Sequence, residues 1–297
     1  MRRILLSGLL LGCSSIVPAK ENVWIIGGGP NPQDSAAQIE FNVNWVVDSL
    51  KNLVPDADLH LYYANGRKKG LSVVEWRPPV EGKTPLLPLA RVFGEHFAAG
   101  YTFRQKRVPD VEGSTQANEL IPALRQGLAK IRPNDRALII YNGHGLRDFK
   151  DAAGNYFRLW RDTRFTARQF GQVLDSVNPK VPVRFVLTQC FAGGFERAIH
   201  PQARDELALA AGQRCGFFAV SKDKEAEGCS PSTKRTSMPW PMPKTRISRN
   251  PLRNCFSIAG NHGIFAGWIP GSYLITSMAI WHEAWHTETA CPKQATA

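Results

Sequence analysis

Two apolar stretches separated by a helix-like segment set the strongest limit on what this chain of 297 residues can fold into. NVWIIGG (22–28) and DLHLYYA (58–64) have the length and composition of strands. Between them, the range 33–53 repeats apolar residues at helical spacing, namely Ile39, Val43, Val46, Val47 and Leu50. A strand, helix, strand order favours parallel strands joined by a right-handed crossover. The sequence therefore predicts an α/β fold with a mainly parallel central sheet.

The same alternation continues along the chain. Further strands are predicted at 137–141, 183–187 and 216–220, and helices at 116–131 and 276–286. Thr166 and Gln169 have the spacing of a capping box and open another helix. The glycines at 27–29 are interrupted by prolines and match no dinucleotide-binding fingerprint, so they indicate a strand-to-helix loop.

One large domain, 20–297, follows a predicted signal peptide, 1–19. Within the domain, five prolines interrupt the range 66–113, which is expected to be an irregular insertion. The range 230–254 is rich in proline, lysine and arginine and is expected to be a basic loop.

The N-terminal residues predict export. Arg2 and Arg3 precede a short apolar run, which is typical of a secretory signal and too short to span a bilayer. Two processing sites compete: VPA before Lys20 suits a signal peptidase, whereas LLGC resembles a lipobox that would end the signal at residue 12 and lipidate Cys13. The expected location is the periplasm, the outer membrane as a lipoprotein attached through Cys13, or the extracellular space.

The formal net charge of +12 comes from basic residues spread through the chain without interleaved aromatics. This distribution indicates a solvated surface rather than a nucleic-acid site, so no nucleic-acid partner is predicted.

Two motifs carry reactive side chains at the ends of predicted strands. YNGHG places His144 after the strand at 137–141, and QCFAGG places Cys190 after the strand at 183–187. In a parallel sheet these ends meet in one crevice, and a histidine beside a cysteine can take the thiol proton. The flanking glycines let main-chain amides approach a substrate carbonyl.

These two motifs resemble those of the caspase-like cysteine peptidases, which include caspases, metacaspases, legumains and gingipains. The resemblance implies a three-layer caspase-haemoglobinase-like fold and cysteine endopeptidase activity on a protein or peptide substrate, without a cofactor or metal. It also implies a His144 and Cys190 dyad, with the amides of Gly145 and Cys190 as oxyanion donors. Two features depart from the family: Thr188 and Gln189 stand where metacaspases carry an acidic residue, and the range 66–113 has no counterpart.

The resemblance further implies that the segment after the strand at 216–220 lines the substrate pocket. Asp148, Gln189, Ser221, Asp223 and Glu225 are the predicted substrate-binding residues. The carboxylates favour a basic or amide side chain before the cleaved bond, whereas Lys222 and Lys224, on the other face of an alternating segment, would suit an acidic one.

Two other functions compete with this interpretation. HEAWH near the C-terminus satisfies H-E-x-x-H and would make His282 and His286 zinc ligands with Glu283 as base, but it lacks the extended zinc motif and lies on a Trp- and Met-rich helical stripe. A catalytically inactive caspase-like binding protein is the other alternative.

The cysteines predict two disulfides in an oxidising compartment. With Cys13 removed or lipidated and Cys190 kept as a reactive thiol, four cysteines remain. Their positions around the predicted strands favour pairing Cys215 with Cys291 and Cys229 with Cys255.

Overall fold

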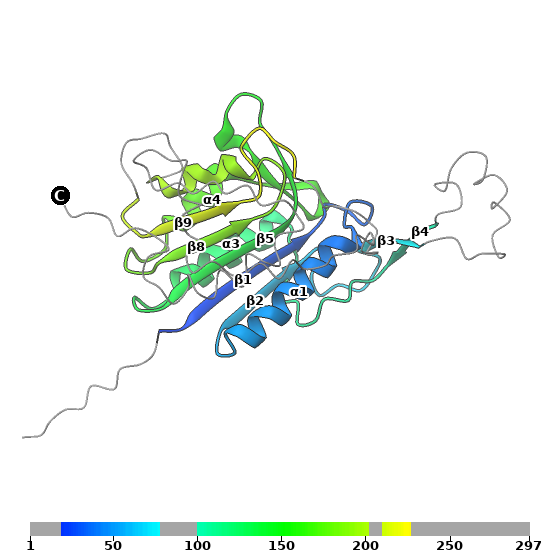
Figure 1. The fold of residues 1–297 in the computed structure, drawn as a ribbon, viewed down its shortest axis with the longest axis horizontal. Helices are drawn as coiled ribbons and strands as arrows, with labels where there is room; N and C mark the ends of the chain where they lie inside the picture. Colours follow the sequence, from blue (N-terminus) through cyan, green and yellow to red (C-terminus); the bar gives the residue numbers. More distant parts are fainter. Residues whose placement is uncertain (1–18, 78–99, 202–209, 227–297) are drawn as a thin grey trace, which may run out of the picture.

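A sheet of mainly parallel strands forms the centre of the computed structural model, which describes residues 19–77, 100–201 and 210–226 (Figure 1). The parallel strands lie in the order β2-β1-β5-β8-β9. Their bounds are β1 Glu21–Gly28, β2 Asp58–Tyr63, β5 Arg136–Leu146, β8 Val183–Leu187 and β9 Arg214–Phe218. The predicted α/β class with a mainly parallel central sheet is confirmed.

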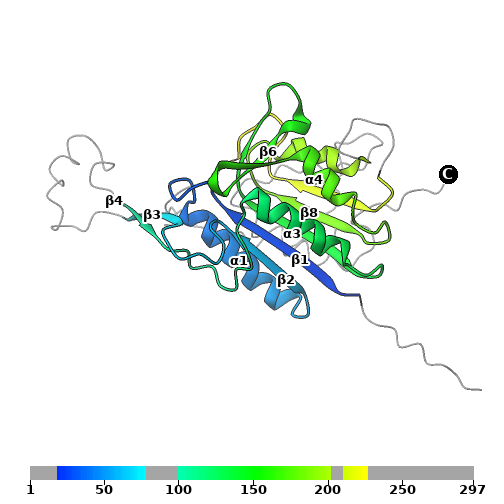
Figure 2. The same ribbon diagram turned by 180° about the vertical axis from the view of Figure 1, so that it is seen from behind.

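Helices cover both faces of this sheet. α1 lies on one face, and α3 and α4 lie on the other, as the two opposite views show (Figures 1 and 2). The helices are α1 Ala37–Leu53, α3 Ala117–Ala129 and α4 Ala167–Leu174, with short 3-10 helices η2 Ala152–Gly154, η3 Trp160–Asp162 and η4 Ala192–Ile199. No helix in the described ranges is long and apolar enough to cross a membrane.

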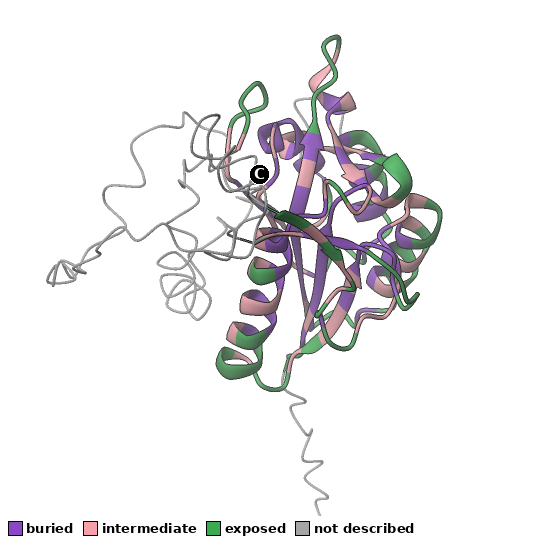
Figure 3. Ribbon diagram, turned by 90° about the vertical axis from the view of Figure 1, so that its right-hand side faces the viewer, coloured by how far each residue is buried: buried purple, intermediate pink, exposed green. Residues whose placement is uncertain are grey.

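The alternation of side chains along β1 explains these layers. Val23 and Ile25 pack with the apolar face of α1, whereas Trp24 and Ile26 pack with α3 and the rest of the opposite core. Because both faces of the central strands are covered, their sequences are continuously apolar rather than alternating. The strands are accordingly the most buried part of the molecule (Figure 3).

β5 extends beyond the strand predicted at 137–141. Its first part pairs in parallel with β1 and β8, and its last three residues pair antiparallel with β6 Tyr156–Leu159, which pairs with β7 Thr163–Thr166. The β6–β7 hairpin was not predicted. It buries Phe157, Leu159 and Phe165 in the core beneath α4.

The range 66–113 is more regular than predicted. It contains an antiparallel hairpin, β3 Val73–Arg77 and β4 Gly100–Arg104, which extends from one end of the molecule (Figure 1). Arg104 of this hairpin bonds Glu75 across the pair and Glu40 of α1. Four of the five prolines that suggested an irregular insertion, at 78–88, lie between these strands in the sequence and outside the described residues.

The other predicted elements agree with the structure to within a few residues. The capping box of Thr166 and Gln169 is present at the start of α4, and the glycines at 27–29 belong to the loop between β1 and α1. The helix predicted from residue 33 begins only at Ala37, because Asn31 accepts a hydrogen bond from the amide of Asp34 and forms a turn there. The basic loop at 230–254 and the helix at 276–286 lie outside the described residues.

Candidate active site

His144 lies on the part of β5 that leaves the parallel sheet, opposite Arg158 of β6. Its Nε2 atom is 2.7 Å from the carbonyl oxygen of Asp34, in the loop between β1 and α1. A carbonyl can only accept a hydrogen bond, so Nε2 carries the hydrogen and Nδ1 is the nitrogen left to accept a proton. The hydroxyl of Tyr141 donates to the carbonyl oxygen of His144 at 2.8 Å and fixes the main chain at this residue.

The loop that supplies this carbonyl is itself held in place. A side chain at Gly29 would overlap the carbonyl of Asp34, so the tight turn requires glycine there. The carboxylate of Asp34 pairs with Arg158 at 3.2 Å, and the side chain of Asn31 bonds both the amide and the carboxylate of Asp34. The hydrogen-bond acceptor of His144 is therefore attached to β6 as well as to its own loop.

Cys190 follows β8 and is half-buried. The amide of Ala226 donates to its Sγ atom at 3.3 Å, and Sγ lies 3.7 Å from the carbonyl oxygen of the same residue. Burial raises the pKa of the Cys190 thiol, and the nearby charge of Glu225 raises it further, whereas the amide of Ala226 lowers it. In this arrangement the sulfur is a thiol that needs a base in order to react.

Neighbouring strands bring the two motifs together. β5 and β8 pair in parallel up to Tyr141 and Leu187, and Asn142 and Thr188 then join the two strand ends through their side chains at 3.0 Å. A Cβ atom on Gly145 would lie 2.3 Å from the carbonyl oxygen of Cys190, so the two main chains are in close contact. The residue after His144 thus touches the residue that carries the thiol.

Four of the five predicted substrate-binding residues lie in three different settings. Asp148 is exposed, and its carboxylate accepts from the amide of Lys150. Ser221 donates to Asp223 at 2.7 Å, which lowers the pKa of that carboxyl. Glu225 lies near enough to Cys190 to affect the thiol pKa.

Gln189 is buried, only 1% exposed, and its side chain packs against Gly145. Neither polar atom of its amide makes a hydrogen bond within the described part of the chain. In this state the side chain fills space between the two strand ends rather than facing solvent.

Asn155 was not among the predicted residues, yet it links the loops around Cys190. Its amide nitrogen donates to the carbonyls of Phe191 at 3.1 Å and Lys222 at 3.0 Å, and its oxygen accepts from the amide of Asp148 at 3.0 Å. Three loops, after β5, β8 and β9, therefore meet on one buried amide group. A Cβ atom on Gly194 would lie 2.4 Å from its nitrogen, so a glycine leaves room for this contact.

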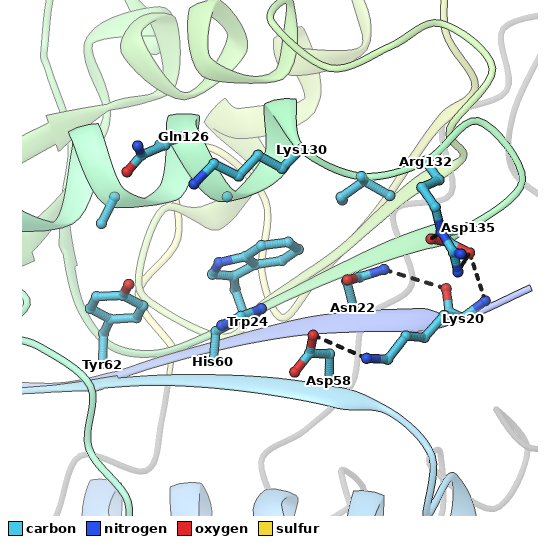
Figure 4. Close-up of a pocket in the computed structure, with 13 residues that line it drawn as sticks. Lys20, Asn22, Trp24, Asp58, His60, Tyr62, Gln126, Lys130, Arg132 and Asp135 are labelled. Carbon is cyan, nitrogen blue, oxygen red and sulfur yellow. Dashed lines mark hydrogen bonds and ion pairs between the residues drawn. The ribbon is translucent and has the colours of Figure 1, made fainter.

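A polar cavity of about 620 Å³ lies elsewhere, between α3 and the β1–β2 edge of the sheet (Figure 4). His60 stacks on Trp24 at its floor, with ring centroids 4.8 Å apart. Two ion pairs stand at one end, Lys20 with Asp58 and Arg132 with Asp135. None of the predicted site residues lines this cavity.

Several predictions fall on residues outside the described ranges. They concern Cys13, the disulfide between Cys229 and Cys255, and the zinc motif with His282, Glu283 and His286. Cys215 is buried in β9, and its predicted partner Cys291 also lies outside these ranges. Among the described residues, no group of histidine, cysteine or acidic side chains is arranged to hold a metal ion.

Comparison with known proteins gives distant likenesses of fold only. No protein-family model matches the chain, and no curated protein matches its sequence. A protein from Geobacter sulfurreducens aligns over 58% of this chain and 51% of its own at 12% identity, with a TM-score of 0.33. A secreted C11 cysteine protease from Bacteroides thetaiotaomicron, solved with an irreversible peptide inhibitor, aligns over 61% of this chain and 45% of its own at 11% identity, with a TM-score of 0.32. The aligned parts span about half the length of either protein.

Proposed function

We propose that this chain is an exported cysteine endopeptidase of the caspase-like type, with Cys190 as nucleophile and His144 as general acid and base. The observation that carries the proposal is the contact between the two strand ends, where the main chain of Gly145 lies against the carbonyl of Cys190. A histidine and a cysteine at adjoining carboxyl ends of parallel strands have the positions that a catalytic pair in this fold class requires.

The hydrogen bond of His144 supports its role as the base. With Nε2 bound to the carbonyl of Asp34, the ring presents Nδ1 as its basic nitrogen. The raised pKa of the Cys190 thiol means that the nucleophile rests as a thiol and loses its proton to the imidazole when substrate binds. Such proton transfer typically contributes about 10²- to 10⁴-fold to the rate.

The reaction then runs in two stages. The Cys190 sulfur attacks the substrate carbonyl carbon, and the oxyanion that forms is stabilised by the amides of Gly145 and Cys190. The imidazolium of His144 gives its proton to the leaving amine, and the acyl group remains on sulfur as a thioester. Water, deprotonated by His144, attacks the thioester, releases the acid product and returns the thiol.

The substrate pocket is proposed to lie along the segment after β9. Main-chain contacts support this position, because the amide of Phe191 donates to the carbonyl of Lys224 at 2.7 Å and the amide of Gly193 donates to that of Val220 at 3.0 Å. Glu225 then lies beside the thiol, where it favours a basic or amide side chain before the cleaved bond. Asp148, Ser221 and Asp223 complete the proposed pocket, whereas Gln189 is buried between the two strand ends and packs against Gly145 instead.

The test combines peptide cleavage with thiol labelling of the purified protein. Cys190→Ala is expected to abolish cleavage of a peptide library, and His144→Ala is expected to lower the cleavage rate by at least about 10²-fold. His60→Ala is the control, because His60 pairs with Glu112, and this variant should keep the wild-type rate.

A peptide-based alkylating probe should modify Cys190 and leave Cys215, only 4% exposed, unmodified in the folded protein. In His144→Ala, the labelling of Cys190 should need a higher pH than the labelling of an ordinary exposed cysteine, because burial raises the pKa of the Cys190 thiol.

Two outcomes would contradict the proposal. One is full activity of Cys190→Ala together with inhibition by a chelator, which would favour the zinc motif at His282 and His286. The other is a folded wild-type protein that cleaves no library peptide, which would favour the inactive binding protein.

A further inference from the structure

The loop that follows His144 carries an exposed cation and an exposed ring beside the candidate nucleophile. The side chain of Phe149 is 83% exposed, and the guanidinium of Arg147 lies 4.1 Å from the centroid of its ring. The same guanidinium lies 5.8 Å from the ring of Phe191, the residue after Cys190. Arg147 therefore contacts two aromatic rings, and one of them belongs to the residue that follows the nucleophile in sequence.

No acidic group within the described ranges pairs with Arg147. Its guanidinium makes neither an ion pair nor a hydrogen bond there, and the carboxylate of neighbouring Asp148 is turned to the amide of Lys150 and towards Gly154. Stacking occupies the face of a guanidinium and leaves the N–H donors on its rim available. These donors match the two oxygens of a carboxylate.

The loop holds this cation at a fixed place relative to the nucleophile. The amide of Asp148, next to Arg147, donates to Asn155, which in turn donates to the carbonyl of Phe191. Gly145, two residues before Arg147, touches the carbonyl of Cys190. The stacked arginine loses less freedom on binding a ligand than a free side chain would, which favours recognition.

We propose that Arg147, together with Phe149 and Phe191, is a specificity subsite for the carboxylate of an acidic residue near the cleaved bond. This inference rests on the proposed endopeptidase function. Because the charge of Glu225 also reaches the Cys190 thiol, the substrate class becomes peptides that carry a basic or amide residue and an acidic residue close to the cleavage site.

The experiment measures kcat/KM on matched peptides that differ only in Glu, Gln or Lys at the position the cleavage library identifies. Wild type should prefer Glu. Arg147→Ala should lower kcat/KM for the Glu peptide by roughly tenfold, the effect of losing one partly exposed charge-assisted hydrogen bond, and leave the Gln peptide little changed. Arg147→Glu should reverse the preference towards Lys, and raised salt should weaken the wild-type preference.

Arg164→Ala is the matched control, because Arg164 lies 4.7 Å from the ring of Tyr156 in the same kind of contact, on the outer strand of the β6–β7 hairpin. It should leave the preference unchanged. Two results would overturn the inference and leave the proposed function intact: equal cleavage of the Glu, Gln and Lys peptides by wild type, or a decrease in kcat/KM in Arg147→Ala that is the same for all three peptides. If Cys190→Ala cleaves as fast as wild type, or wild type cleaves nothing, the proposed function itself fails.

Discussion

At the scale of single residues, Asn155 shows how one buried amide can organise a site. It satisfies two carbonyls and one amide from three separate loops, and it does so from a position that is 1% exposed. The residues that supply the two carbonyls lie 36 and 67 residues away in sequence. Only the folded chain brings them together, so no local pattern marks this residue.

We predict that Asn155→Ala lowers both stability and turnover. The substitution leaves buried main-chain groups without partners, which costs about 2 kcal/mol in the free energy of unfolding. It also releases the loop carrying Phe191, and a shift of about 1 Å at a catalytic centre reduces the rate by roughly 10²-fold. Urea denaturation and kcat at a temperature where the variant is folded measure the two effects.

The control for this prediction is Asn178→Ala, which removes an exposed side chain whose one hydrogen bond within the described residues comes from the amide of Lys180. It should change neither quantity appreciably. If Asn155→Ala melts earlier but keeps its kcat and the pH profile of Cys190 labelling, the residue is structural and does not position the nucleophile.

At the scale of elements, the β3–β4 hairpin is attached to α1 by charge. Glu40 of α1 is 3% exposed and accepts from Arg104 at 2.6 Å and from the amide of Arg107. Arg104 also bonds Glu75 at 2.7 Å. Partial burial lowers the pKa of Arg104, but the bonds to Glu40 and Glu75 outweigh it and raise the pKa, so the guanidinium stays charged.

We predict that Glu40→Ala destabilises the protein by about 3 kcal/mol, because it breaks a buried ion pair and leaves two donors without an acceptor. The surface pair of Lys51 with Asp110 provides the comparison, with side chains that are 53% and 84% exposed. Lys51→Ala should change the unfolding free energy by no more than about 0.5 kcal/mol. Chemical denaturation of both variants measures the difference, and equal midpoints would contradict the role given to Glu40.

The elements that sequence alone predicted are those with a local signal. The strand at 183–187 agrees end to end, because a five-residue segment rich in valine and phenylalanine between turn residues is typical of a strand and too short for most helices. The cap at Thr166 agrees because a capping box is a local pattern of only four residues. The β6–β7 hairpin was missed, since its strands have four residues each and are joined by η3, in which Arg161 has a positive φ of 59°.

In the candidate site, too, the sequence predicts only the residues that have a local signal. His144 and Cys190 stand out because each is a reactive side chain between an apolar strand and glycines. The carbonyl of Asp34 and the amide of Ala226 are main-chain groups that any residue could supply, so their contacts with the pair leave no mark in the sequence.

At the scale of the whole molecule, one cluster of rings joins the elements on the α4 side of the sheet. Phe170 of α4 lies with its ring 5.4–5.8 Å from the ring centroids of four others, at steep angles. Those rings belong to Phe157, Phe165, Phe185 and Phe195, on β6, β7, β8 and η4. Edge-to-face contacts of this kind add to the free energy of burial.

We predict that Phe170→Ala lowers the free energy of unfolding by about 3–5 kcal/mol, a large part of the roughly 5–15 kcal/mol typical of a folded protein. Phe149→Ala, which removes the exposed ring of the loop after His144, should leave the unfolding midpoint unchanged. A midpoint for Phe170→Ala equal to that of wild type would mean that the cluster does not hold these elements together.

The direction of the parallel strands also determines which end of the molecule is available for attachment to a surface. The parallel strands all begin at the end of the sheet where Lys20 meets Asp135, and all run towards the end where His144 and Cys190 lie. Whatever is joined ahead of Lys20 is therefore attached at the far end from the thiol. A chain tethered to a bead or a surface through its amino end would present the reactive loops outward, with the whole length of the sheet as a spacer beneath them.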